Sequence, residues 1–220
     1  METAIFIFIL FGLIAGIFSR RILRYYPEQE LRVDLKFPIL EISNAVIYAL
    51  VYIGYGVSVQ AFVYLLLCSL MIWIAILDFH KYIIPDEAVI AGLILGIFFY
   101  LIKIFSGSNN YWAPILAMLL GPAFYLIAGE IAYIITKQEG IGGGDIKLMA
   151  PVGLVLGIPL SIAVIIISTI LGGLVSAAVL LIGRKQKHDT IAFGPFISIA
   201  TIIAALYGNN ILEWYFTHFI

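Results

Sequence analysis

Two aspartates are the residues of this chain whose type and setting best suit chemistry. Asp145 ends a glycine-rich stretch between two long apolar segments, and Asp78 ends another apolar run. A carboxylate in hydrocarbon is costly, by about 2.5 to 3.5 kcal/mol at the centre of an inserted helix, so each needs a reason to be there. Two adjacent carboxyl groups can share one proton, so that one deprotonates water while the other protonates a carbonyl under attack. The pair predicts peptide hydrolysis without a metal or a nucleophilic side chain.

The glycine-rich stretch favours this interpretation over a purely structural one. Four of the five residues 140–144 are glycine, including Gly142, Gly143 and Gly144. Glycines allow positive φ angles and the close approach of another segment, so we expect either or both here. The alternative remains open that each aspartate caps a helix or pairs with a nearby lysine, Lys81 or Lys147.

The composition indicates a membrane protein with several crossings. Of the 220 residues, 63% are hydrophobic and 11% charged, and the mean hydropathy is +1.12. The apolar runs approach the length of about 20 residues that crosses a bilayer as a helix, and they lack the alternation of a barrel strand. A net charge of −1 argues against a nucleic-acid partner. The chain is therefore predicted to be all-α, with the lipid bilayer as its surroundings.

The positions of the basic residues predict the orientation of about eight transmembrane helices. Eleven of the twelve Lys and Arg residues fall in alternate loops on one side, and only Lys103 falls opposite, so that side is taken as cytoplasmic and the N-terminus as outside. The sixth helix is short for a crossing. The helices are expected at about 3–18, 38–54, 59–77, 87–104, 112–135, 146–158, 160–182 and 191–207.

The chain is expected to form one transmembrane domain, 1–220, with a short cytoplasmic loop, 19–37, between its first two helices. The first apolar run lacks a basic start and a small-residue cleavage site, so we interpret it as a retained anchor. The single cysteine, Cys68, allows neither an internal disulfide nor a thiolate metal cluster.

Four other charged residues are candidates for accessory roles. Glu41 lies inside an apolar helix, where a carboxylate requires a partner or a function. Glu139 and Lys147 flank the glycine-rich stretch and could tune Asp145 or hold the loop. Asp86 follows Pro85, which ends a helix, and is more consistent with a cap on the next helix than with catalysis.

Several ordered blocks of the sequence resemble the type 4 prepilin peptidases, which belong to the Gly-x-Gly-Asp intramembrane aspartyl proteases. The block 139–150 resembles the family's Glu-Gly-Met-Gly-x-Gly-Asp pattern with its following Lys-Leu, and Asp78 with 84–86 resembles an aspartate followed by Leu-Pro-Asp. The similar blocks follow the family order from residue 12 to about 200. The remaining blocks are 12–18, 37–41 and 193–196.

The resemblance implies that Asp78 and Asp145 are the catalytic residues of a prepilin leader peptidase. The implied substrate is a type IV prepilin or pseudopilin helix, whose basic leader is cut at the cytoplasmic face of the inner membrane. Peptidase activity would need no cofactor. The implied second activity, N-methylation with S-adenosylmethionine, is left open, and Glu41 would then be a candidate for that site.

One departure from the family pattern concerns the first loop. Classical members carry a long cytoplasmic insert with two Cys-x-x-Cys pairs there, whereas loop 19–37 has no cysteine. Zinc is therefore not expected, and no metal site is predicted. A different class of function is also open: a proton- or ion-coupled transporter that uses Glu41, Glu130, Asp78 and Asp145 as a relay.

Overall fold

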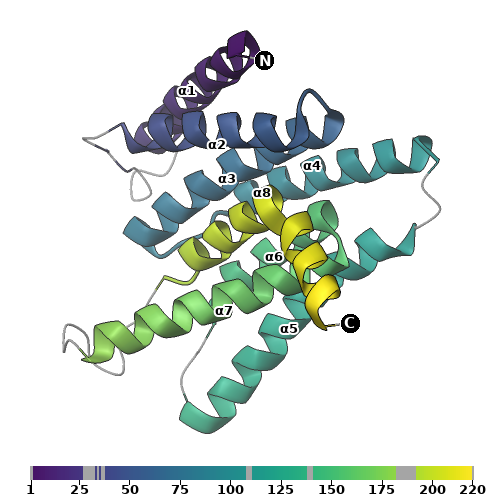
Figure 1. Ribbon diagram of the computed structural model, residues 1–220. Helices are drawn as coiled ribbons and strands as arrows, with labels where there is room; N and C mark the ends of the chain where they lie inside the picture. Colours follow the sequence, from purple (N-terminus) through teal and green to yellow (C-terminus); the bar gives the residue numbers. More distant parts are fainter. Residues whose placement is uncertain are drawn as a thin grey trace.

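The computed structural model describes residues 2–26, 33, 35, 38–107, 111–137, 141–181 and 192–219. Across these residues the chain forms eight α-helices and no β-strand, which confirms the predicted all-α fold (Figure 1). The helices are α1 (Glu2–Arg24), α2 (Ile39–Tyr55), α3 (Val59–Lys81), α4 (Asp86–Phe105), α5 (Trp112–Thr136), α6 (Gly143–Leu156), α7 (Ile158–Leu181) and α8 (Gly194–Phe219).

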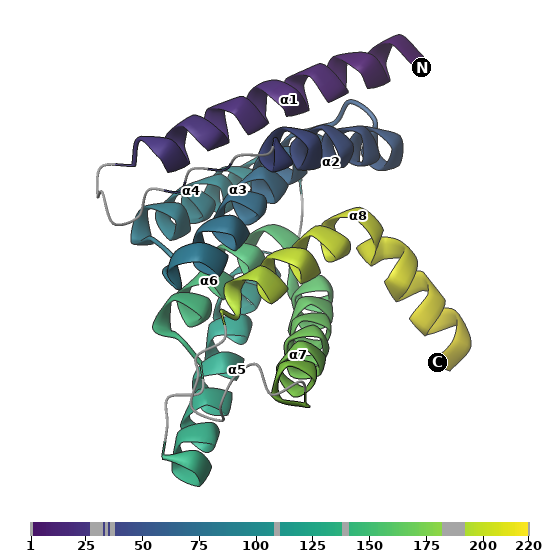
Figure 2. The ribbon, with the colours of Figure 1, turned by 90° about the vertical axis from the view of Figure 1, so that its left-hand side faces the viewer.

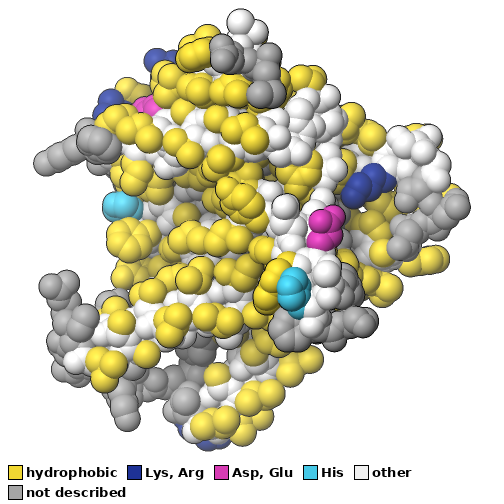
Figure 3. Space-filling view, in the orientation of Figure 1, with side chains coloured by type: hydrophobic (Ala, Val, Ile, Leu, Met, Phe, Trp, Pro, Cys, Tyr) yellow, Lys and Arg dark blue, Asp and Glu magenta, His cyan; other side chains and the backbone are white. Residues whose placement is uncertain are grey.

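Six of the described helices are long and apolar enough to cross a membrane: α1, α3, α4, α5, α7 and α8. Helix α2 is also apolar but has 17 residues, and α6 has 14. At 1.5 Å per residue, α6 is only about 20 Å long. Large apolar side chains such as Phe6, Ile94 and Ile134 are more than half exposed, and yellow apolar atoms cover much of the face in Figure 3. The chain is a polytopic membrane protein, and its surface suits contact with lipid.

Helix α6 lies at the centre of the bundle, between α4, α5, α7 and α8 (Figures 1 and 2). From Leu148 to its end at Leu156 the helix carries no charged residue, and every residue of this part except Ala150 is buried, as expected of a helix enclosed by others. Small residues let its neighbours approach closely. A Cβ on Gly92 of α4 would lie 2.9 Å from the Pro151 side chain, and one on Gly153 would overlap the carbonyl oxygen of Ala117 in α5. This packing fixes the position of Asp145 at the start of α6.

The first helix extends further than the sequence predicted. It continues through Arg24 rather than ending at residue 18, so the connection to α2 begins at residue 25 instead of 19. Leu23 in the added segment is fully buried, so its packing stabilises the continuation of the helix. Arg21 and Arg24 lie in its last turn, where the helix dipole favours positive charge.

The starts of α6 and α8 also differ from the prediction. Helix α6 begins at Gly143 rather than 146, which places Asp145 inside its first turn. Helix α8 begins at Gly194 rather than 191 and continues to Phe219 rather than ending at 207, and it bends along its length (Figure 2). Between α6 and α7, Gly157 has a φ of 80°, a conformation that glycine adopts without strain.

Enlarging residue 153 should destabilise the bundle around α6. Gly153→Ala places a methyl group against the backbone of α5, and we expect a loss of about 1 to 3 kcal/mol because that backbone cannot easily move aside. Thermal unfolding in detergent measures the loss. The matched control is Gly54→Ala in α2, where a Cβ would meet nothing within 4 Å. Equal midpoints for the two variants would contradict the packing described for α6.

Candidate active site

The structure brings the two predicted aspartates together. Asp78 lies in the last turn of α3 and Asp145 in the first turn of α6, and their residues are 5% and 7% exposed. The two carboxyl groups are close enough for their charges to interact. A chain with few charges therefore holds two acidic groups near each other and largely out of solvent.

Ile84, in the turn between α3 and α4, packs against the segment that carries Asp145 and against the start of α8. A Cβ on Gly144, next to Asp145, would lie 3.1 Å from Cβ of Ile84. A Cβ on Gly194, at the start of α8, would lie 3.1 Å from Cδ1 of the same side chain. One isoleucine thus contacts the first turns of both α6 and α8. In the sequence, Ile84 stands out only as part of the matched block 84–86, and its residue type carries no signal of this contact.

Asp78 has a backbone hydrogen-bond donor on α8. The N–H of Gly194 donates to Oδ2 of Asp78 across 3.0 Å, and the bond is buried. As the first residue of a helix, Gly194 has an N–H without an acceptor inside the helix, so it is available to a side chain. Gly194 lies in the matched block 193–196, but this role could not be predicted from the sequence, because a backbone donor leaves no signal in residue type.

Asp145 occupies the third position of α6, from which its side chain reaches back toward the amide of Gly142. Its Oδ1 atom is buried and has no hydrogen-bond partner among the described residues. Buried polar atoms are nearly always paired with protein or water, so this oxygen is suited to receive a water molecule or a substrate group.

Of the two properties expected of the glycine-rich stretch, positive φ angles are not found at its described glycines. Gly142 has a φ of −68°, and neither Gly143 nor Gly144 is among the residues with positive φ. Close approach of another segment is found at Gly144, and Gly142 lies close to Asp145 of its own stretch. A Cβ on Gly142 would lie 3.0 Å from Oδ2 of Asp145, and Gly144 packs against Ile84. A Cβ on Gly143 would meet nothing within 4 Å.

Lys147 and Asp86 form an ion pair at the edge of this site. The Nζ and Oδ1 atoms are 2.9 Å apart, and the side chains are 58% and 68% exposed. The predicted cap by Asp86 is wrong: Asp86 is the first residue of α4, Pro85 precedes it, and no side chain caps the helix. Its carboxylate instead links the start of α4 to Lys147, the fifth residue of α6. Glu139 lies outside the described residues.

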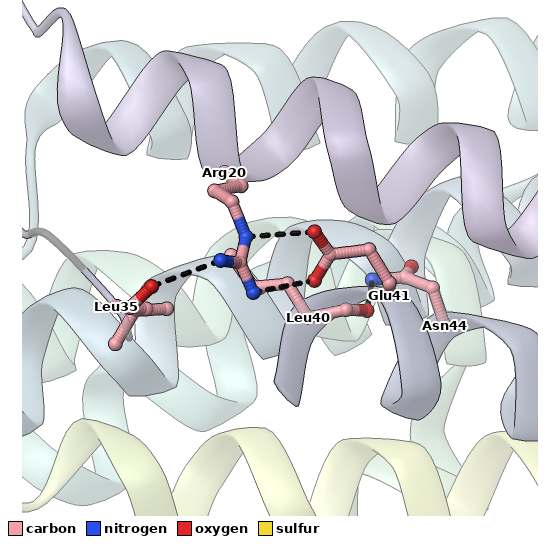
Figure 4. A network of polar contacts seen from close by, with 5 residues as sticks. All are labelled: Arg20, Leu35, Leu40, Glu41 and Asn44. Carbon is pink, nitrogen blue, oxygen red and sulfur yellow. Dashed lines mark hydrogen bonds and ion pairs between the residues drawn. The ribbon is translucent and has the colours of Figure 1, made fainter. Parts of the chain in front are cut away.

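Glu41 is engaged by Arg20 of α1, as Figure 4 shows. Its two oxygens lie 2.7 Å from Nε and 2.8 Å from Nη2 of the guanidinium, whose Nη1 also donates to the carbonyl of Leu35 at 2.9 Å. A Cβ on Gly16 would overlap the backbone of Glu41, so α1 and α2 are in close contact here. Glu41 therefore joins two helices and the segment between them.

No group of three or more His, Cys, Asp or Glu side chains within the described ranges is placed to hold a metal ion. The arrangement around Asp78 and Asp145 offers two acidic groups, one backbone donor and one unpaired carboxylate oxygen. These are the components of acid–base hydrolysis.

Comparison with known proteins agrees with this chemistry. Residues 65–177 match the model of the type IV leader peptidase family, a range that includes both aspartates. A prepilin leader peptidase/N-methyltransferase of Bacillus subtilis is 32% identical over 84% of this chain and 71% of its own length. Proteins of the same name from Pseudomonas putida and Aeromonas hydrophila are 29% and 27% identical, and the matches cover 62% and 64% of their lengths. No solved structure matches the chain.

Removing the charge of Glu41 should destabilise the contact between α1 and α2. Glu41→Gln leaves the partly buried guanidinium of Arg20 without its counter-charge, and we expect a loss of about 1 to 3 kcal/mol in thermal unfolding. Glu130→Gln is the control, since Glu130 is exposed and we expect a change within about 0.5 kcal/mol. If both variants unfold at the parental temperature, the pair does not stabilise this contact.

Proposed function

The chain belongs to the type IV leader peptidase family, and we propose that it removes the basic leader of type IV prepilins or pseudopilins with Asp78 and Asp145 as its catalytic pair. The observation that carries the proposal is the placement of two buried carboxyl groups within electrostatic range of each other. They come from helices separated in sequence, and both lie inside the matched family range.

The proposed reaction needs only these two groups and water. The ionised carboxylate takes a proton from water, whose oxygen attacks the carbonyl carbon of the scissile peptide bond, while the protonated carboxyl group gives its proton to the carbonyl oxygen. The carboxyl group that took the water proton then gives it to the leaving nitrogen, the other carboxylate takes a proton from a hydroxyl of the tetrahedral diol, and the C–N bond breaks to leave a carboxylic acid and an amine. The pair again holds one proton at the end. Hydrolysis of this type requires neither a metal nor an organic cofactor.

An apolar groove beside Asp78 supports a membrane helix as substrate. The groove has a volume of about 480 Å³ and lies between α3, α7 and α8. Its wall includes Phe79, which follows Asp78, and Pro195, which follows the Gly194 donor. When the scissile peptide bond of a substrate lies at the two acids, the residues on one side of that bond would lie against this apolar wall. A prepilin has that character, with a polar leader joined to an apolar helix.

We further propose that the site opens on the cytoplasmic face of the inner membrane. Helices α3, α5 and α7 end, and α4 and α8 begin, toward one side of the bundle, on the left in Figure 1. Lys81 and Lys137 are at these ends, whereas Lys103 is near the opposite end of α4. Basic residues accumulate on the cytoplasmic side of membrane proteins. A basic leader that has not crossed the membrane is on that side too.

Methyl transfer is not part of the proposal. The matched relatives carry N-methyltransferase in their names, and Glu41 was the candidate for a methyl-donor site here. Both oxygens of Glu41 are bound by the guanidinium of Arg20, so this carboxylate does not fit as a ligand for S-adenosylmethionine.

The transporter alternative is not favoured. A relay would need acids that follow one another through the membrane depth, but Glu41 is paired with Arg20 and Glu130 is exposed. The family match also supports a peptidase.

Neutralising either member of the pair should slow cleavage strongly. We expect Asp78→Asn and Asp145→Asn each to reduce the rate by about 10² to 10⁴, because a neutral amide can neither take nor give the proton. Coexpression with a prepilin and mass spectrometry of the pilin reports leader loss and any methyl addition together. Glu213→Gln, an exposed acid on α8, is the control. Parental cleavage by either Asp variant would refute the assignment.

Cysteine labelling can establish the orientation. Cys68 is buried and is the single cysteine, so Cys68→Ala gives a background for new thiols. In spheroplasts, we expect a membrane-impermeant maleimide to label Ser106→Cys, at the end of α4, and to label Lys137→Cys, at the end of α5, only after lysis. Both positions are exposed. The reverse pattern would place the two acids on the outer face.

A further inference from the structure

The contact between α8 and Asp78 depends on residue 194 being glycine. A Cβ there would lie 2.7 Å from Oδ2 of Asp78, closer than the backbone nitrogen itself, which is at 3.0 Å. The same Cβ would lie 3.1 Å from Cδ1 of Ile84. The missing side chain is therefore what allows the N–H of Gly194 to reach the carboxylate.

Phe193, the preceding residue, anchors this end of α8 through its ring. The ring packs edge-on against Tyr125 of α5 with centroids 5.6 Å apart, and against Phe196 with centroids 5.9 Å apart. On its other side is Gly172 of α7, where a Cβ would lie only 2.6 Å from Cε2 of Phe193. The ring thus occupies a space that exists because residue 172 has no side chain.

Tyr125 forms a rigid surface against which the Phe193 ring packs. It is 1% exposed, and its hydroxyl is 2.6 Å from Oγ of Ser168 in α7. Ser168 donates its own proton to the carbonyl of Val164 at 2.6 Å, so the tyrosine is the donor in the hydrogen bond between the two hydroxyls. Tyr125 is therefore held by packing and by a directed hydrogen bond, and Phe193 is held against it.

We propose that Phe193 and Gly194 form a positioning element for Asp78. The space at Gly172 and the side chain of Tyr125 fix the position of the Phe193 ring. The ring in turn fixes the position of the first turn of α8. The N–H of Gly194 then holds the Asp78 carboxyl group in its orientation toward Asp145. Both are positioning residues, since neither supplies a proton or a nucleophile. The inference rests on the proposed function, because it assumes that the orientation of Asp78 limits the rate.

Two neighbouring glycines of α7 provide the experiment. Gly172→Ala adds a methyl group that displaces the Phe193 ring, whereas Gly173→Ala adds one that would meet nothing within 4 Å. With purified protein and prepilin in detergent, we expect Gly172→Ala to lower kcat by about tenfold to a hundredfold, with KM unchanged, and Gly173→Ala to match the parent. A change confined to kcat is expected of a displaced acid and not of a loosened fold, and thermal midpoints are compared in parallel.

A double variant tests whether the effect passes through Phe193. Phe193→Leu shortens the side chain, so we expect a lowered kcat by itself and no further loss when Gly172→Ala is added, because the clash is gone. The comparison of Phe193→Leu with the double variant also tests the positioning role if Gly172→Ala alone folds poorly. Additive losses, or equal kcat values for Gly172→Ala and Gly173→Ala, would overturn the positioning role. Asp78→Asn and Asp145→Asn are assayed alongside: if they still cleave, the proposed function itself has failed.

Discussion

The structure depends on holding two like-charged groups together where little water can screen them. Each acid is costly to bury, and a second one nearby adds repulsion. The fold offsets this cost locally. Asp78 receives the N–H of Gly194, and Asp145 has the amide of Gly142 nearby. Each acid is thus associated with a glycine at or just before the start of a helix, a place where backbone donors are available.

Close packing through glycines makes this arrangement rigid. Gly153 lets α5 press against α6, and Gly172 admits the Phe193 ring between α5, α7 and α8. A membrane bundle cannot draw on water exclusion between helices, so contact at short range and small residues at interfaces supply much of its association energy. Because the helices carrying the acids are fixed in this way, the distance between the acids is set by the whole bundle rather than by one loop.

Most of the architecture could be predicted from the sequence, but the details of the site could not. Continuous apolar runs gave all eight helices, since hydrocarbon imposes both length and composition. The two acids were predicted from their cost in a membrane and from family resemblance. The end of α1 was predicted too early because Arg20 pairs with Glu41 of α2 and Leu23 packs in the core. A local sequence pattern does not reveal such long-range contacts. Asp86 was assigned as a cap for the same reason: its partner, Lys147, is distant in sequence.

The directions of the helices explain why the pair suits one shared negative charge. Asp78 lies in the last turn of α3, where the helix dipole disfavours an anion, whereas α6 and α8 both begin beside the pair with their positive ends toward it. The N-terminal ends of α6 and α8 favour a negative charge on the pair, and the C-terminal end of α3 disfavours it. Each of these dipole effects acts only within about one helical turn. One carboxylate is therefore supported by nearby amides, while a second charge would meet the repulsion of the first. A pair that holds one negative charge and one proton is what the hydrolysis of a peptide bond by two acids requires.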